Sequence, residues 1–136
     1  MPRNLIGESL RFWRLAVDYI DDRRRSRATV REFDALGPEA CAHALSDSGV
    51  TPAEFRRAMR LPFASADLLA PAMRSVGIDP AATAGQQPAS YRELCRTCML
   101  CGHRMRCRGD LGSSKFARTH EEFCPNSERF GDFIAQ

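Results

Sequence analysis

Residues 95–107 read CRTCMLCGHRMRC, and this stretch carries four of the six cysteines in the chain. Cys98 and Cys101 form a C-x2-C pair, a spacing that lets two sulfur atoms turn toward one point. Cys107 follows after five residues, and Cys124 returns from a separate segment after sixteen more. Metal–thiolate bonds can offset the entropy lost in closing such a loop. The spacing therefore predicts one metal centre held by four thiolates.

The composition of the chain does not call for cysteines as disulfide cross-links. The chain has 136 residues, of which 43% are hydrophobic, enough for one domain to bury a core without cross-links. Its first ten residues contain no apolar run of signal-peptide length. No stretch approaches the roughly 20 apolar residues that a membrane-spanning helix needs. We therefore expect a cytoplasmic protein without membrane association, where clustered cysteines indicate metal or redox chemistry.

The basic residues are almost all arginine. The formal net charge is +3, and Lys115 is the one lysine among 20 basic residues. Arginine stays charged and binds carboxylates and phosphates through a planar fork. The group can be a solvated helix face, partly neutralised by the preceding aspartates, or a contact for nucleic acid or an acidic partner. Its densest members are Arg23, Arg24, Arg25, Arg27 and Arg31.

Apolar periodicity predicts helices throughout. The first helix shows apolar residues at spacings of four and three, which places them on one face. We expect that face to pack in the core, with Trp13 as an anchor. The Asp/Arg run after Ile20 can continue the helix as a polar extension. The residues of the stripe are Ile6, Leu10, Trp13, Val17 and Ile20.

Proline and glycine residues, which end or begin helices, divide the remaining chain into short helices. Thr51, followed by Pro52 and by Glu54 three residues after it, has the pattern of a capping box. No alternating strand pattern of useful length occurs. The predicted fold is all-α, a small bundle of about seven short helices around the tetra-cysteine centre. We expect an Arg-rich region over residues 1–60 and a cysteine-cluster domain over 61–136, joined in one compact unit. Further helices are expected at 30–36, from Pro38, at 65–76, from Pro80, from Pro88, and around Phe116 and Phe123.

Five cysteines between residues 95 and 124 exceed the needs of a four-ligand centre. One ligand set is Cys98, Cys101, Cys107 and Cys124, and the other replaces Cys107 by Cys95. His103 could replace one sulfur, or hydrogen-bond to a cluster without ligating it.

Four arginines lie close to these cysteines in sequence. We expect them to lower the pKa values of the thiols and to offset the negative charge of a tetrathiolate site. They are Arg96, Arg104, Arg106 and Arg108.

The spacing favours iron over zinc. Zinc sites usually show two C-x2-C knuckles or a Cys/His pair of pairs, and no second knuckle surrounds Cys124. The run Cys95-x2-Cys98-x2-Cys101 with a remote Cys-Pro is similar to the ferredoxin-type cluster run. The run Cys98-x2-Cys101-x5-Cys107 resembles the end of the cluster loop in endonuclease-III-type DNA glycosylases, although the rest of that loop is absent here. Both resemblances imply a [4Fe–4S] cluster, and Zn²⁺ is the alternative.

A broader resemblance covers residues 61 to the C-terminus. They resemble a small bacterial domain family of unknown function that pairs a helix turn with a C-x2-C-x5-C run and a late Cys-Pro-Asn. This resemblance implies the ligand set Cys98, Cys101, Cys107 and Cys124, with Cys95 outside the pattern. Residues 27–60 resemble, more weakly, short Arg-rich bacterial proteins thought to contact RNA. The matches are at Leu69, at Val76-Gly77-Ile78-Asp79-Pro80, at the three clustered cysteines and at Cys124-Pro125-Asn126.

No catalytic constellation is present in the sequence. It contains no Gly-rich phosphate loop, nucleophile elbow or HExxH pair, so we expect a protein that is not an enzyme. The first hypothesis is an iron–sulfur protein that acts as a redox- or oxygen-responsive regulator or a small electron carrier, with a protein or redox partner. The alternative is a zinc-stabilised module that binds nucleic acid or an acidic protein. The oligomeric state is left open.

Overall fold

A computed structural model of the chain describes residues 5–46 and 48–134. Over these residues it contains nine α-helices, a short 3-10 helix and no strand, which confirms the all-α prediction. The helices are α1 (Leu5–Leu36), α2 (Pro38–Ser46), α3 (Pro52–Met59), α4 (Leu69–Ser75), α5 (Pro80–Gln86), α6 (Pro88–Met99), α7 (Arg104–Gly112), α8 (Phe116–Thr119), the 3-10 helix η1 (His120–Glu122) and α9 (Ser127–Ile134).

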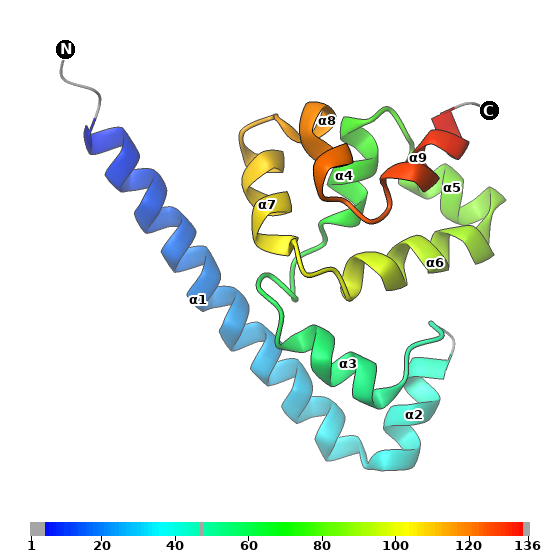
Figure 1. Cartoon of the computed structure of the whole chain (residues 1–136). Helices are drawn as coiled ribbons and strands as arrows, with labels where there is room; N and C mark the ends of the chain where they lie inside the picture. Colours follow the sequence, from blue (N-terminus) through cyan, green and yellow to red (C-terminus); the bar gives the residue numbers. More distant parts are fainter. Residues whose placement is uncertain (1–4, 47, 135–136) are drawn as a thin grey trace.

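The first helix is far longer than expected. The predicted helices around 6–20 and 30–36 are a single helix, α1, of 32 residues, which corresponds to about 48 Å. No glycine or proline interrupts residues 8–36, so the Asp/Arg run continues the helix. It ends at Gly37, whose positive φ of 87° turns the chain into α2. Figure 1 shows α1 as a rod along the whole molecule.

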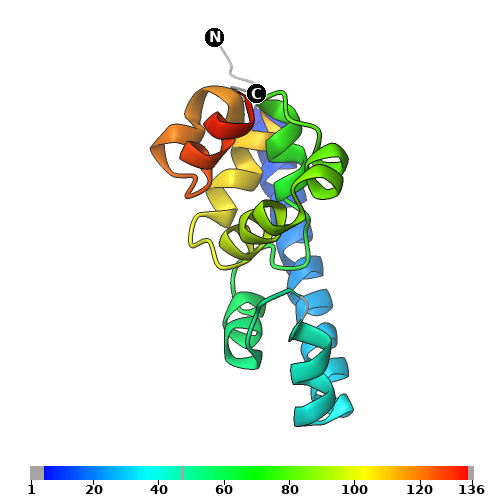
Figure 2. The ribbon, with the colours of Figure 1, turned by 90° about the vertical axis from the view of Figure 1, so that its right-hand side faces the viewer.

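The prediction that Trp13 anchors the core is wrong. Trp13 is 66% exposed, and Leu10, Val17 and Ile20 on the same stripe are 53–58% exposed. Ile6, the first residue of that stripe, has a side chain outside the described residues. The reason is tertiary: α2 and α3 pack along the C-terminal half of α1, and its N-terminal half projects beyond them (Figures 1 and 2).

A small core joins the C-terminal half of α1 to α2 and α3. Cys41, Leu45 and Phe55 are buried in it. The rings of Phe33 and Phe55 lie 4.4 Å apart between centroids. The capping box predicted at the start of α3 is confirmed. The hydroxyl of Thr51 accepts a hydrogen bond from the Glu54 backbone N–H at 3.1 Å, and the Glu54 carboxylate accepts one from the Thr51 N–H at 3.2 Å.

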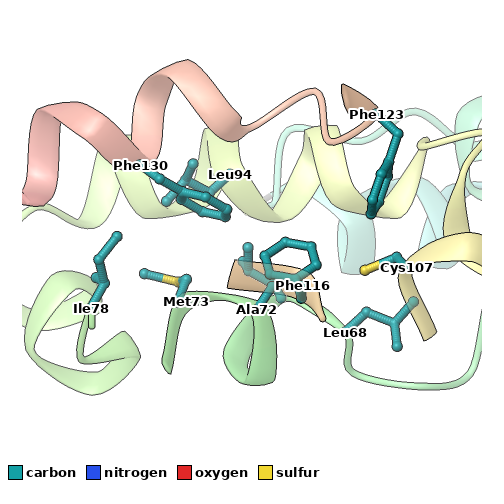
Figure 3. Close-up of a cluster of buried hydrophobic side chains, with 10 residues drawn as sticks. Leu68, Ala72, Met73, Ile78, Leu94, Cys107, Phe116, Phe123 and Phe130 are labelled. Carbon is teal, nitrogen blue, oxygen red and sulfur yellow. The ribbon is translucent and has the colours of Figure 1, made fainter. Parts of the chain in front are cut away.

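A second, larger core lies within α4 to α9. Figure 3 shows Met73 and Phe116 facing Phe130 and Leu94, with Cys107 in the same cluster. Helix α4 begins at Leu69 rather than at 65, because Pro71 lacks an N–H and is tolerated only in a first helical turn. In Figure 1, α6 lies along the side of the second core that faces α3, and α7 lies on the side that faces α1.

The loop between α3 and α4 is fixed from both sides. Asp22 of α1 is buried, and its carboxylate accepts hydrogen bonds from the Ser65 N–H at 2.8 Å and the Ser65 hydroxyl at 2.5 Å. The guanidinium of Arg23 donates to the carbonyl oxygens of Arg60, at 2.9 Å, and of Leu61. The middle of α1 therefore holds this loop, which leads into α4.

Within the described residues, no helix has both the length and the apolarity needed to cross a bilayer.

Candidate metal centre

Four cysteines from four places in the chain line one cavity. Cys98 lies near the end of α6, Cys101 in the following turn, Cys107 on α7, and Cys124 in the turn between η1 and α9. The cavity measures ≈ 20 Å³, about the space of one water molecule. The remaining wall is apolar apart from Arg104 and Asn126, and is formed by Leu68, Leu69, Ala72, Phe123, Pro125 and Phe130.

The other candidate ligands lie elsewhere. Cys95 is on α6, but its thiol hydrogen-bonds to the Tyr91 hydroxyl and is not part of the cavity wall. His103 has an exposed side chain, and its backbone N–H donates to the sulfur of Cys101 at 3.2 Å. Cys41 is buried in the separate core beside α1. All six cysteines lie in the described part of the chain, and all are free thiols.

Burial controls the protonation of these thiols. It raises the pKa of Cys98 to about 11 and that of Cys107 to about 12, and it also raises the pKa of Cys124. Among the smaller causes, neighbouring thiols of the same cavity raise the pKa of Cys98, Cys107 and Cys124 further. The four sulfurs are thus close enough to interact electrostatically. In the absence of a metal the thiols of Cys98, Cys107 and Cys124 are neutral, and metal binding must displace their protons.

The expectation that nearby arginines lower these pKa values holds for Arg104, but as the smaller of two opposing effects. Arg104 acts against burial at Cys98 and Cys107, but does not outweigh it. The other three arginines pair with carboxylates: Arg96 with Glu54 at 2.5 Å, Arg106 with Glu122, and Arg108 with Asp18 at 3.0 Å.

Arg104 is the charged group of the site. Its side chain is only 4% exposed, in a protein interior where charges are normally paired. Its Nη1 donates to the Cys98 carbonyl oxygen at 2.7 Å and lies 3.6 Å from the Cys98 sulfur. Its Nη2 donates to the carbonyl oxygens of Phe63, at 2.9 Å, and Ala66, at 2.8 Å. No carboxylate in the described residues pairs with it, and its Nε has no partner.

Backbone amides supply further donors to sulfur. The N–H groups of Asn126 and Ser127 hydrogen-bond to the sulfur of Cys124, as the His103 N–H does to that of Cys101. The side chain of Asn126 is buried, and its Nδ2 holds the Leu94 carbonyl at 3.0 Å. Its Oδ1 has no partner among the described residues. Such N–H···S bonds tune metal–thiolate centres and orient their ligands.

The donor set fits a tetrathiolate centre in its chemistry. Four thiols, amide donors to two of them and a buried cation line the same apolar cavity. As the side chains stand, no three Cys, His, Asp or Glu residues within 5–46 and 48–134 are arranged to hold a metal ion. Ligation of a single metal ion therefore requires the thiols to turn toward a common point, and a [4Fe–4S] cluster also requires this cavity of ≈ 20 Å³ to widen.

The structure also places the Arg-rich segment. Arg23, Arg24, Arg27 and Arg31 line an open groove between α1 and α3, whereas Arg25 points away and pairs with Asp21 at 3.0 Å. Sequence reasoning missed the other polar residues of this groove, which are Ser26, Asp34, Arg56 and Arg60. It also missed the special position of Arg104. The one available signal was the second arginine group at residues 56–60, and nothing in the sequence distinguished Arg104 from its neighbours.

Comparisons of the chain with family models, with curated proteins and with solved structures found no match.

Proposed function

We propose that this chain is a non-enzymatic iron–sulfur protein in which Cys98, Cys101, Cys107 and Cys124 hold a [4Fe–4S] cluster. The observation that carries the proposal is Arg104, a buried guanidinium that has no carboxylate partner among the described residues and lines the same cavity as the four cysteines, 3.6 Å from the Cys98 sulfur. An unpaired charge in a protein interior is costly. Four metal-bound thiolates would supply the negative charge that balances the Arg104 guanidinium.

Residues around the cysteines provide a dry wall and hydrogen-bond donors to the sulfurs. The cavity wall excludes water through Leu68, Leu69 and Phe123, and a dry wall strengthens the attraction between Arg104 and the thiolates. The amide donors to Cys101 and Cys124 stabilise the deprotonated sulfurs. The cluster, when bound, supplies one-electron redox chemistry.

The same contacts favour a regulator over a simple electron carrier. Arg104 connects Cys98 to the carbonyl oxygens of Phe63 and Ala66, and Asp22 of α1 holds the same loop through Ser65. Phe63 has a positive φ of 57°, a conformation that is unfavourable for a bulky side chain and is maintained by its surroundings. Loss of the thiolate charge beside Arg104 would weaken these contacts. A change in oxidation state or cluster content would then alter how the loop packs against α1.

The exposed half of α1 supports a protein partner for this regulator. Leu10, Trp13 and Val17 form a continuous apolar stripe in solvent, and such stripes mark interaction surfaces more often than single exposed residues do. Residence in the reducing cytoplasm and membership of the bacterial family with the same cysteine pattern are part of this proposal.

A zinc-stabilised binding module is the second candidate, because the four thiols and the Arg-lined groove would serve it equally well. Metal content separates the two. Protein purified without oxygen should be brown, absorb broadly in the visible range, and contain iron and sulfide in equal amounts. A colourless protein with one zinc per chain would contradict the iron–sulfur proposal and support the zinc-stabilised binding module. Absence of both metals after anaerobic purification and reconstitution would overturn both.

A further inference from the structure

We infer that the groove between α1 and α3 binds the phosphodiester backbone of a single-stranded nucleic acid. Six arginines line it, namely Arg23, Arg24, Arg27, Arg31, Arg56 and Arg60. The one acidic residue in its wall is Asp34, which already pairs with Arg56 at 3.0 Å. The groove encloses ≈ 930 Å³ and is open to solvent, which suits a polymer rather than a small anion.

Four of these arginines are available to a ligand. Arg23 is held by the carbonyl oxygens of Arg60 and Leu61, so it serves the fold. The side chains of Arg24, Arg27, Arg31 and Arg60 are exposed and have no ion pair within the described residues. Residues 24 and 31 are separated by about 10 Å along α1, which is enough to contact successive phosphates with bidentate arginine forks.

A buried hydroxyl in the groove is an independent sign of a ligand. Ser26 of α1 is part of the groove wall and is 1% exposed, yet its Oγ has no hydrogen-bond partner in the part of the chain that the structure describes. Leaving a buried polar group unsatisfied costs about 1–3 kcal/mol. The Nε of Arg23, in the same wall, is also without a partner. A phosphate oxygen seated among the arginines would satisfy these groups.

The outer face of α1 favours nucleic acid over an acidic peptide. At helical spacing, Arg24, Arg27 and Arg31 share the face that carries Trp13 and Ile20 toward the N-terminus. Trp13 is 66% exposed and lies about 16 Å along the axis from Arg24. Proteins that bind single strands combine a basic groove with aromatic side chains on which bases stack. Trp13 provides such a surface beside the basic groove, and an acidic peptide has no bases to stack on it.

The test uses the full-length protein and a fluorescently labelled 15-nucleotide oligouridine, with the same length of oligothymidine as a second probe. The triple variant Arg24→Ala/Arg27→Ala/Arg31→Ala should weaken binding of the preferred strand by at least about tenfold. It should also flatten the dependence of log affinity on log salt by about 2, because each lost phosphate contact on a single strand contributes about 0.7. The matched control is Arg11→Ala/Arg14→Ala/Arg25→Ala, which removes the same charge from α1 outside the groove and should change affinity far less.

Ser26→Ala tests the hydroxyl separately. It should weaken binding several-fold while leaving thermal stability unchanged or raised, because the unfilled groove gives this hydroxyl no partner. Oligouridine should quench Trp13 fluorescence, whereas inorganic polyphosphate, which has no bases, should compete without quenching. Equal affinity of the triple variant and its control would overturn the site. Stronger competition by polyglutamate than by unlabelled oligonucleotide would assign the groove to an acidic protein instead. None of these outcomes depends on the metal at the cysteines, which is measured separately.

Discussion

Arg104 and Cys98 are joined by two contacts, a 2.7 Å hydrogen bond from Nη1 to the Cys98 carbonyl oxygen and a 3.6 Å approach of the same nitrogen to the Cys98 sulfur. They connect the end of α6 to the start of α7 around the turn that carries Cys101. Because Nη2 of the same guanidinium holds the loop at Phe63 and Ala66, the charge state of the sulfur is coupled to the packing of that loop.

The first prediction concerns this guanidinium. Arg104→Lys keeps the charge but replaces a planar fork by a single ammonium that cannot reach three carbonyl oxygens at once. We expect the variant to lose bound metal to a chelator about 10- to 100-fold faster than the wild type, as the loss of groups that support metal ligands does elsewhere. The control is Arg106→Lys, whose side chain is half-exposed and pairs with Glu122. If both variants lost metal at the same rate, Arg104 would have no role in the metal centre beyond packing.

Single replacements of cysteine by serine should sort the six thiols into two classes. Cys98, Cys101, Cys107 and Cys124 line the cavity, so each replacement should abolish the intact centre. Cys95→Ser should leave metal content unchanged, because its thiol faces Tyr91. Metal per chain, measured after anaerobic purification, is the readout, and Cys41→Ser is the control for a buried thiol outside the site. Loss of metal in Cys95→Ser with retention in Cys107→Ser would favour the other ligand set.

The contact of Asp22 with Ser65 should make stability depend on acid pH. Burial raises the pKa of Asp22, but hydrogen bonds from Ser65 and the charge of Arg23 outweigh it and hold the pKa below 3.8. A lowered folded pKa means that the stabilisation is complete above the unfolded value, about 3.9, and disappears as pH falls through the folded value. Asp22→Asn should therefore cost about 1–3 kcal/mol at pH 7, and progressively less as the pH falls below the unfolded value.

Urea unfolding followed by circular dichroism at several pH values measures this difference. Asp21→Asn is the control, because Asp21 is exposed and pairs only with Arg25, also exposed. Its effect should stay within about 0.5 kcal/mol at all pH values. A penalty for Asp22→Asn that is the same at pH 3 and pH 7 would contradict the assignment.

The capping box should contribute measurably to the N-terminal core. Thr51→Ala removes the hydroxyl that accepts the Glu54 N–H, and should cost about 1 kcal/mol of unfolding free energy. Thr29→Ala is a matched control inside α1, where the hydroxyl bonds back to the Arg25 carbonyl and contributes little to helix stability. Denaturant midpoints of the two variants should differ clearly, and coinciding midpoints would contradict the prediction.

Trp13 reports directly on the exposed half of α1. It is the single tryptophan, so fluorescence has one source. At low protein concentration its emission should resemble that of free tryptophan in water, and acrylamide should quench it readily. Trp13→Ala should change the unfolding free energy by less than about 0.5 kcal/mol, as is usual for exposed positions. A blue-shifted emission independent of concentration would show that Trp13 packs within its own chain.

Several local features followed from the sequence because their causes are local. The capping box requires only Thr51, Glu54 and a helix between their backbone groups, all within four residues. The end of α1 at Gly37-Pro38 depends on the backbone freedom of one residue and the missing N–H of the next. The all-α class likewise followed from short-range apolar spacing.

The face that a helix buries is not a local property. Spacing placed Leu10, Trp13 and Val17 on one stripe of α1, and that stripe exists. Burial additionally needs a partner surface, and α2 and α3 lie against the C-terminal half of the helix instead. The sequence pattern alone cannot state which part of a long helix the rest of the chain will reach.

The sequence by itself determined the number and spacing of the thiols and the helices that carry them. The tertiary structure alone decided that Cys107, rather than Cys95, shares a cavity with Cys98, Cys101 and Cys124. It also decided that Arg104, rather than its neighbours, lies beside the Cys98 sulfur without a carboxylate partner among the described residues. It also decided that burial, not arginine, controls the pKa values of Cys98 and Cys107. The physical reason is that desolvation and charge pairing depend on distances through space, and residues far apart in the chain set those distances.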